Sequence, residues 1–164
     1  MNNEIITTEP KPAPFRIMYA DEILFELCDP AAKLPERADD GCSGYDLFSV
    51  ERVEVPPGEV KIVSTGLKWE PPTNEIELQV RPRSGMAAKH GVTVLNAPGT
   101  VDASYRGLIK AILINHSKIP YQVNVGDRIA QAVFARVEKS YTLKITDKVG
   151  ETKRGEGGMG STGR

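Results

Sequence analysis

One acid and one aromatic ring stand together in Gly99–Gly107, a segment bracketed by glycines between two β-rich runs. Glycine permits tight turns and close approach of a ligand to the backbone, so the flanking strands could hold Asp102 and Tyr105 at a pocket. Such an arrangement presents a reactive carboxylate beside a ring. Aspartate and glycine are also the commonest residues of ordinary turns, so this segment alone leaves a plain hairpin turn equally open.

Two other segments combine turns with residues that bind anions. Arg83 and Ser84 precede a short helical stretch, whose N-terminal amides would complete an anion site, although the serine could instead only cap the helix. Gly126–Gln131 opens a strand whose alternation could turn Gln131 toward a pocket. Asp46 lies in an alternating strand, where an acid is either solvated or paired with a buried arginine.

The last stretch of the chain is rich in glycine and predicts no regular element of its own. It is either a frayed tail or a flexible lid that wraps polyphosphate oxygens. In the second interpretation the bare amides, the hydroxyls of Ser161 and Thr162 and the guanidinium of Arg154 would bind the phosphates.

The elements that must position these residues are short β-type runs separated by Pro and Gly. This pattern predicts an all-β sandwich or jelly roll rather than a βαβ fold. The helical candidates are Asp21–Leu27 and Gly85–His90, with a further turn near Pro30–Lys33. The expected strands are Phe15–Tyr19, Gly44–Ser49, Glu59–Leu67, Glu75–Val80, Val92–Leu95, Leu108–Asn115, Tyr121–Val125 and Ile129–Val137.

The 164 residues suit one domain flanked by two arms. Residues 1–14 are polar and carry three prolines, which predicts a flexible N-terminal arm. Residues 15–150 form the predicted β domain, and residues 151–164 form a glycine-rich mobile C-terminal arm.

The charge balance excludes a general attraction to nucleic acid or to an anionic membrane, because 21 basic residues face 22 acidic ones. Cys28, Cys42, His90 and His116 lack the spacing of zinc ligands and predict two reduced thiols. No apolar run approaches a membrane span or a signal peptide. We therefore expect a soluble, intracellular protein that binds phosphate only locally.

The order of the motifs along the chain is more specific than any one of them. Together they closely resemble the five motifs of the trimeric deoxyuridine triphosphatases (dUTPases), from about residue 35 to residue 164. The resemblance implies the distorted jelly-roll-like barrel of that family with one or two short helices. It also implies hydrolysis of dUTP to dUMP and pyrophosphate, which keeps uracil out of DNA and supplies dUMP for thymidylate synthesis. The motifs are GYDLFS (44–49), RPRSGMAAKHG (81–91), NAPGTVDASYRG (96–107), GDRIAQ (126–131) and RGEGGMGSTG (154–163).

The resemblance assigns the chemistry to the third motif. Asp102 matches the acid that deprotonates the water attacking the α-phosphorus, a role for which a carboxylate is competent. Tyr105 matches the ring that packs under the deoxyribose and excludes a 2′-hydroxyl, and Asn96 matches the amide that reads the uracil edge. The hairpin from Gly99 to Lys110, with Thr100 and Val101, supplies the other contacts to the base.

The resemblance assigns phosphate binding to the remaining motifs. Arg83, Ser84 and Gly85 match contacts from a neighbouring subunit of a homotrimer, and Gln131 matches a contact near the phosphates. Mg²⁺ would be held mainly by the triphosphate, with no direct protein ligand, and Asp46 matches a supporting acid near it. The arm residues that match contacts to the nucleotide are Arg154, Met159, Gly160, Ser161 and Thr162.

Two positions depart from the family pattern. Met159 stands where the arm usually carries Phe, and a thioether can cover the base with more rotamer freedom to lose. We expect retained activity with a less ordered arm. Ser104 stands where many members carry an acid, and we expect only a minor effect there.

Two rival functions remain. A dCTP deaminase shares the fold but uses a glutamate near the base, and residues 89–135 contain none. A non-catalytic relative that binds a nucleotide or a protein partner would be expected to show a damaged third motif or a large insertion, and neither is evident.

Overall fold

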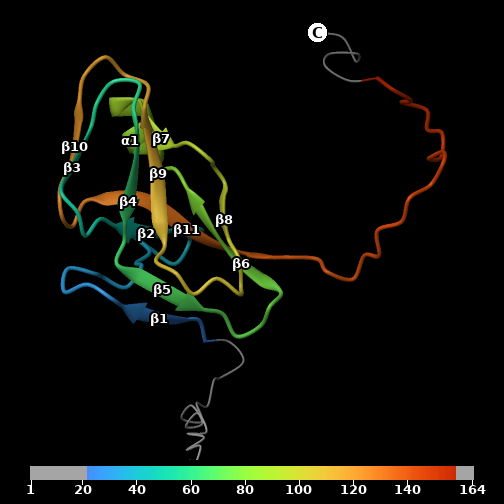
Figure 1. Cartoon of the computed structure of the whole chain (residues 1–164), viewed down its shortest axis with the longest axis horizontal. Helices are drawn as coiled ribbons and strands as arrows, with labels where there is room; N and C mark the ends of the chain where they lie inside the picture. Colours follow the sequence, from blue (N-terminus) through green and yellow to red (C-terminus); the bar gives the residue numbers. More distant parts are fainter. Residues whose placement is uncertain (1–21, 158–164) are drawn as a thin grey trace, which may run out of the picture.

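The computed structural model describes residues 22–157, so the predicted strand Phe15–Tyr19 and the arm residues Met159 to Thr162 lie outside it. Apart from one short helix, the regular elements of the described part are all strands (Figure 1). The elements in chain order are β1 (Leu24–Leu27), β2 (Tyr45–Phe48), β3 (Val53–Val55), β4 (Val60–Ser64), β5 (Leu67–Glu70), β6 (Ile76–Arg81), α1 (Ser84–His90), β7 (Val92–Val94), β8 (Gly99–Val101), β9 (Lys110–Asn115), β10 (Tyr121–Val123) and β11 (Arg128–Arg136).

The strands form antiparallel sheets around one core. One sheet has the order β2-β11-β6-β8, and a second has the order β4-β9-β7. Two ribbons, β1-β5 and β10-β3, complete the set among the described residues. The predicted all-β class is confirmed, and the single helix of residues 22–157 lies where Gly85–His90 was predicted to be helical.

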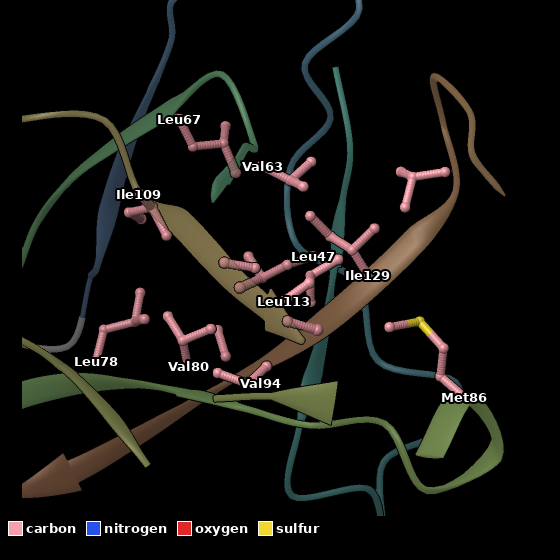
Figure 2. Packing of buried hydrophobic residues seen from close by; sticks show 14 of the residues in the cluster. Leu47, Val63, Leu67, Leu78, Val80, Met86, Val94, Ile109, Leu113 and Ile129 are labelled. Carbon is pink, nitrogen blue, oxygen red and sulfur yellow. The ribbon is translucent and has the colours of Figure 1, made fainter. Parts of the chain in front are cut away.

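Alternating side chains of the two larger sheets fill the space between them. Leu47 and Ile129 come from the four-stranded sheet, and Val63 and Leu113 come from the three-stranded one. Figure 2 shows these side chains directed toward one another. All four are essentially inaccessible to solvent, so burial of this apolar surface holds the two sheets in a fixed relation.

The predicted helix over Asp21–Leu27 is wrong in its described part. Leu24–Leu27 is the strand β1, which pairs with β5 so that Phe25 lies opposite Trp69. Four apolar residues within this short run are compatible with either element, and the distant partner β5 decides between them. The turn expected near Pro30–Lys33 is present, with the Ala32 amide donating to the Asp29 carbonyl over 3.0 Å.

The predicted single strand Glu59–Leu67 is divided in two. β4 ends at Ser64 and β5 begins at Leu67, and Gly66 between them has a φ of +67°. An L side chain rarely adopts that conformation. The chain therefore leaves one sheet at Gly66 and enters the ribbon with β1.

The predicted hairpin from Gly99 to Lys110 is not a pair of bonded strands. β8 pairs with β6, whereas β9 pairs with β4 and β7. Residues 102–109 are thus a loop that crosses from one sheet to the other. We call residues 99–110 the crossing loop, including its two strand ends.

After β11 the chain runs away from the body of the domain (Figure 1). Residues 138–157 are almost all exposed, and Tyr141, Leu143 and Ile145 keep at least 78% of their surface accessible. Across residues 22–157, no helix has the length and apolar character needed to cross a bilayer.

Gly66→Ala tests the turn between β4 and β5. A Cβ there would lie 2.9 Å from side-chain atoms of Asp29 and Val50, in addition to the positive φ. Gly58→Ala is the matched control, because Gly58 has a φ of +74° and nothing within 4 Å of its Cβ position. We expect Gly58→Ala to lower the free energy of unfolding by about 1 kcal/mol, and Gly66→Ala to lower it by about 1–3 kcal/mol more. Urea denaturation measures both, and equal losses would contradict this account.

Candidate functional site

The crossing loop lines a pocket of about 260 Å³ together with Val80 of β6 and with Ile62 and Ile112 of β4 and β9. Its floor is apolar, with Val80 and Ile109 among the buried residues. Polar groups stand at its rim, as is usual in small-molecule sites. The residues of the third motif that line it are Asn96, Gly99, Thr100, Val101, Asp102 and Tyr105, and Lys110 follows them.

The glycines that bracket the motif permit close contacts. A Cβ on Gly107 would clash with the ring and hydroxyl of Tyr105, and one on Gly99 would lie 3.0 Å from the amide nitrogen of Asn96. Neither glycine has a positive φ. The sequence needs glycine here because two side chains lie against the backbone, not because the backbone is left-handed.

Tyr105 lies over the loop with its hydroxyl donating to the Leu108 carbonyl over 3.3 Å. Its amide donates to the Asp102 carbonyl over 3.0 Å, which closes a turn around Ala103 and Ser104. The ring is fixed at both ends and still 45% exposed. Because Tyr105 also lines the pocket, it is accessible to a ligand there.

Asp102 is exposed beside this ring, at the end of β8. Within residues 22–157 no group donates a hydrogen bond to its carboxylate. Both carboxylate oxygens can therefore accept from a water molecule or a ligand.

A second group of polar residues gathers on the outer face of the four-stranded sheet. Asp46 on β2 is nine-tenths buried and accepts from Arg83 Nε at 3.1 Å and from Arg128 Nη1 at 3.0 Å. Tyr121 lies near the charged groups of Arg83 and Asp127. Burial raises the pKa of its phenol and the Asp127 carboxylate raises it further, while the Arg83 guanidinium opposes both.

Gln131 is central in this group, because it lies opposite Asp46 on one side and Arg81 on the other. Its side chain lies against Gly44, where a Cβ would clash with it. Strict alternation would place Gln131 on the same face as Ile129. The register of β11 shifts between Arg128 and Ala130, and this bulge leaves Ile129 in the core while Gln131 faces outward.

Ser84 is not the helix cap that the sequence left open. The N-cap of α1 is Arg83, and no side chain caps the helix. The Ser84 hydroxyl makes no hydrogen bond within the described residues, and Ser84 and Gly85 are both exposed. The first turn of α1 therefore keeps its polar groups available to a ligand.

The predicted site residues thus fall into separate groups within one chain. The pocket that Asp102 lines does not include Asp46, Arg83 or Gln131. Arg154 lies in the segment beyond β11, where its Nε donates to the Gly157 carbonyl over 2.8 Å. Sequence reasoning missed Arg128, which follows Asp127 in the fourth motif, and only its basic character could have drawn attention to it.

No three His, Cys, Asp or Glu side chains of residues 22–157 come together in a way that could hold a metal ion. Cys28 and Cys42 are free thiols.

The dUTPase family model matches residues 31–163 of the chain. The chain belongs to the dUTPase family. It is 50% identical over 132 residues to the deoxyuridine 5'-triphosphate nucleotidohydrolase of Alkaliphilus metalliredigens, covering 80% of this chain and 90% of the relative. The protein of the same name from Crocosphaera subtropica is 51% identical over 132 residues, covering 80% and 92%.

Solved structures of dUTPases share the fold. The dUTPase of Staphylococcus bacteriophage 80alpha, solved with dUpNHpp, superposes with a TM-score of 0.78 at 24% identity over 88% of this chain and 99% of that one. The enzyme of phage phi11 gives a TM-score of 0.72 at 22% identity, over 79% and 98%. These comparisons confirm the dUTPase-like jelly-roll fold, and the family confirms the predicted enzyme class, a dUTP diphosphatase.

Proposed function

We propose that the chain hydrolyses dUTP to dUMP and pyrophosphate with Asp102 as the general base. The single observation that carries this is the position of Asp102, exposed and without a partner in the described residues, at the rim of a pocket of about 260 Å³. In this role the carboxylate takes a proton from the water that attacks the α-phosphorus. Removal of dUTP would keep uracil out of DNA, and the dUMP formed would supply thymidylate synthesis.

Asp102→Asn removes the proton acceptor and keeps the shape of the side chain. We expect kcat for dUTP to fall roughly 10²- to 10⁴-fold, the usual contribution of a general base, with an unchanged melting temperature because the carboxylate supports no other group. Release of pyrophosphate measures the rate. Turnover within a few-fold of the wild type would remove Asp102 from the mechanism.

The pocket supports discrimination at both the sugar and the base. The exposed face of Tyr105 would pack under the deoxyribose and leave no room for a 2′-hydroxyl, and Asn96 with the backbone of Thr100 and Val101 would read the uracil edge. Lys110 lines the same pocket. The pocket of about 260 Å³ combines an apolar lining with a few polar groups, as small-molecule sites do.

Gly107→Ala tests the sugar contact through the position of the ring. The new Cβ clashes with Tyr105, so the ring must move and the barrier to a 2′-hydroxyl weakens. We expect the ratio of kcat/KM for dUTP to that for UTP to fall by about tenfold, equivalent to about 1.4 kcal/mol. Gly150→Ala is the control, since nothing lies within 4 Å of its Cβ position. An unchanged ratio in Gly107→Ala would separate the ring from sugar selection.

The outer polar group supports a phosphate site. Arg83 with the first-turn residues Ser84 and Gly85, together with Gln131, would bind the triphosphate by charge-assisted hydrogen bonds. Mg²⁺ would be held chiefly by the phosphate oxygens, with Asp46 as a supporting acid, and would neutralise charge that develops on the leaving pyrophosphate. For the phi11 enzyme, a structural Mg(II) ion has been described.

The arm completes the proposed site. Residues 151–164 would close over the nucleotide, with Arg154, Ser161 and Thr162 on the phosphates and Met159 and Gly160 near the base. Arg154 lies in the exposed segment beyond β11, where it is accessible to a ligand. Residues 1–14 would form a flexible N-terminal arm, and residues 15–150 would form the β domain.

A homotrimer with shared sites would bring the separate groups together. The sheet β4-β9-β7 supports assembly, because it is apolar on both faces. Its inner face is in the core, and its outer face exposes Val60 (42%) and Ile62 (60%) beside Ile112 and Ile114, while Leu95 (50% exposed) follows directly after β7. An antiparallel sheet that faces water is usually polar on that side, so this face suits a second copy of the chain.

The segment beyond β11 gives independent support for assembly. Tyr141, Leu143 and Ile145 alternate with polar residues, which is the pattern of a half-buried strand. All three are exposed in the single chain. A partner subunit that paired with this segment would bury them.

Val60→Glu tests the trimer. A charge on the outer face of β4 should lower the mass measured by light scattering and reduce activity more steeply on dilution, because a desolvated charge opposes association. Val125→Glu is the control, since Val125 is also exposed (53%) but lies outside that sheet. A wild-type monomer that remains active would refute the shared-site proposal.

A comparison of dUTP with dCTP, dTTP and UTP distinguishes the rival functions. Turnover of dUTP alone agrees with the proposal, and ammonia release from dCTP would indicate a deaminase. If all four nucleotides are inert, a non-catalytic binding protein becomes the better interpretation.

A further inference from the structure

Arg83 is held in the described chain by two separate acceptors. Its Nε donates to Asp46 Oδ1 over 3.1 Å, and its Nη1 donates to the backbone carbonyl of Arg128 over 3.1 Å. Its Nη2 has no hydrogen-bond partner among residues 22–157. The guanidinium is thus fixed along one side and keeps donors free on the other.

The second oxygen of Asp46 is occupied by the side chain of Arg128, with Nη1 at 3.0 Å from Oδ2. The carboxylate therefore lies between two cations and accepts one charge-assisted hydrogen bond on each oxygen. With Arg128 donating to Oδ2, Arg83 donates to Oδ1 alone, and its Nη1 bonds instead to the Arg128 carbonyl.

The bulge in β11 makes this arrangement possible. Arg128 and Gln131 are three residues apart, so in a regular strand they would face opposite sides of the sheet. The register shift between Arg128 and Ala130 puts Arg128 opposite Phe48 and Gln131 opposite Asp46. Phe48 and Asp46 are two residues apart, so both β11 side chains lie on the outer face.

We propose that Arg128 is a positioning residue that keeps the free donors of Arg83 directed at the triphosphate. This inference rests on the proposed function. When the Arg128 charge is removed, Asp46 Oδ2 loses its partner, and Arg83 turns to bind both oxygens, the geometry that guanidinium and carboxylate prefer. The N–H groups of Arg83 are then no longer available to the triphosphate.

Arg128→Gln should raise KM for dUTP about tenfold, the loss of roughly one charge-assisted hydrogen bond, and leave kcat within about twofold. Arg128→Lys keeps a cation for Asp46 and should restore most of the affinity. The control is Arg136→Gln, which removes an exposed arginine from the far end of the same strand. Melting temperatures of all variants exclude a general loss of fold.

A double-mutant cycle separates positioning from direct contact. If Arg128 acts through Arg83, Arg83→Gln and the pair Arg83→Gln with Arg128→Gln should have the same KM. Additive losses would mean that Arg128 binds the phosphates itself, and an unchanged KM in Arg128→Gln would remove it from the site. Either result overturns the proposal.

A crystal structure of the Arg128→Gln protein gives a readout that does not depend on turnover. We expect Arg83 to donate to both oxygens of Asp46, and an Arg83 that keeps its bond to the residue 128 carbonyl would refute the proposal. If the wild type fails to hydrolyse dUTP, the proposed function fails, while this structural result still decides how Arg83 is held.

Discussion

The two-sided pairing of β11 is the constraint on which both the core and the polar group depend. The strand bonds to β2 along one edge and to β6 along the other, so its register is fixed from both sides. The bulge near its start buries both Ile129 and Ala130 while Arg128 and Gln131 face outward. A regular strand that kept Gln131 on the outer face would expose Ile129 and turn Arg128 into the core, and burying an unpaired charge there is costly.

Most strands could be predicted from the sequence because each has one face in the core, which gives a period of two between turn residues. That signal failed where the partner is distant or the strand is very short. β1 is a strand only because β5 pairs with it, some forty residues later. Gly66 divides a run that looks continuous, and β8 and β9 join different sheets although the loop between them resembles a hairpin.

The candidate site likewise contains residues that could be predicted from the local sequence and residues that could not. The residues of the crossing loop could be predicted, because an acid and a ring between glycines form a local motif, and the structure brings them to one pocket. The role of Arg128 could not be predicted, because the face of the sheet on which its side chain lies depends on a β-bulge. The alternation of apolar and polar residues in the sequence does not reveal that bulge. A pairing of Asp46 with one arginine was among the alternatives that the sequence left open. The second arginine that binds Asp46 is Arg128, which lies 82 residues away in the sequence.

The two carboxylates of these groups are prepared for different tasks by their surroundings. Asp46 has both oxygens engaged by guanidinium groups and nine-tenths of its surface buried, so it holds two cations in place and is largely shielded from solvent. Asp102 is exposed and accepts nothing from the described residues. On the proposed function, fixed positive charge and a free base act on the same triphosphate, yet they lie in different parts of one chain. The proposed assembly would resolve this separation, because a neighbouring copy could place its phosphate-binding residues beside the pocket that holds the base.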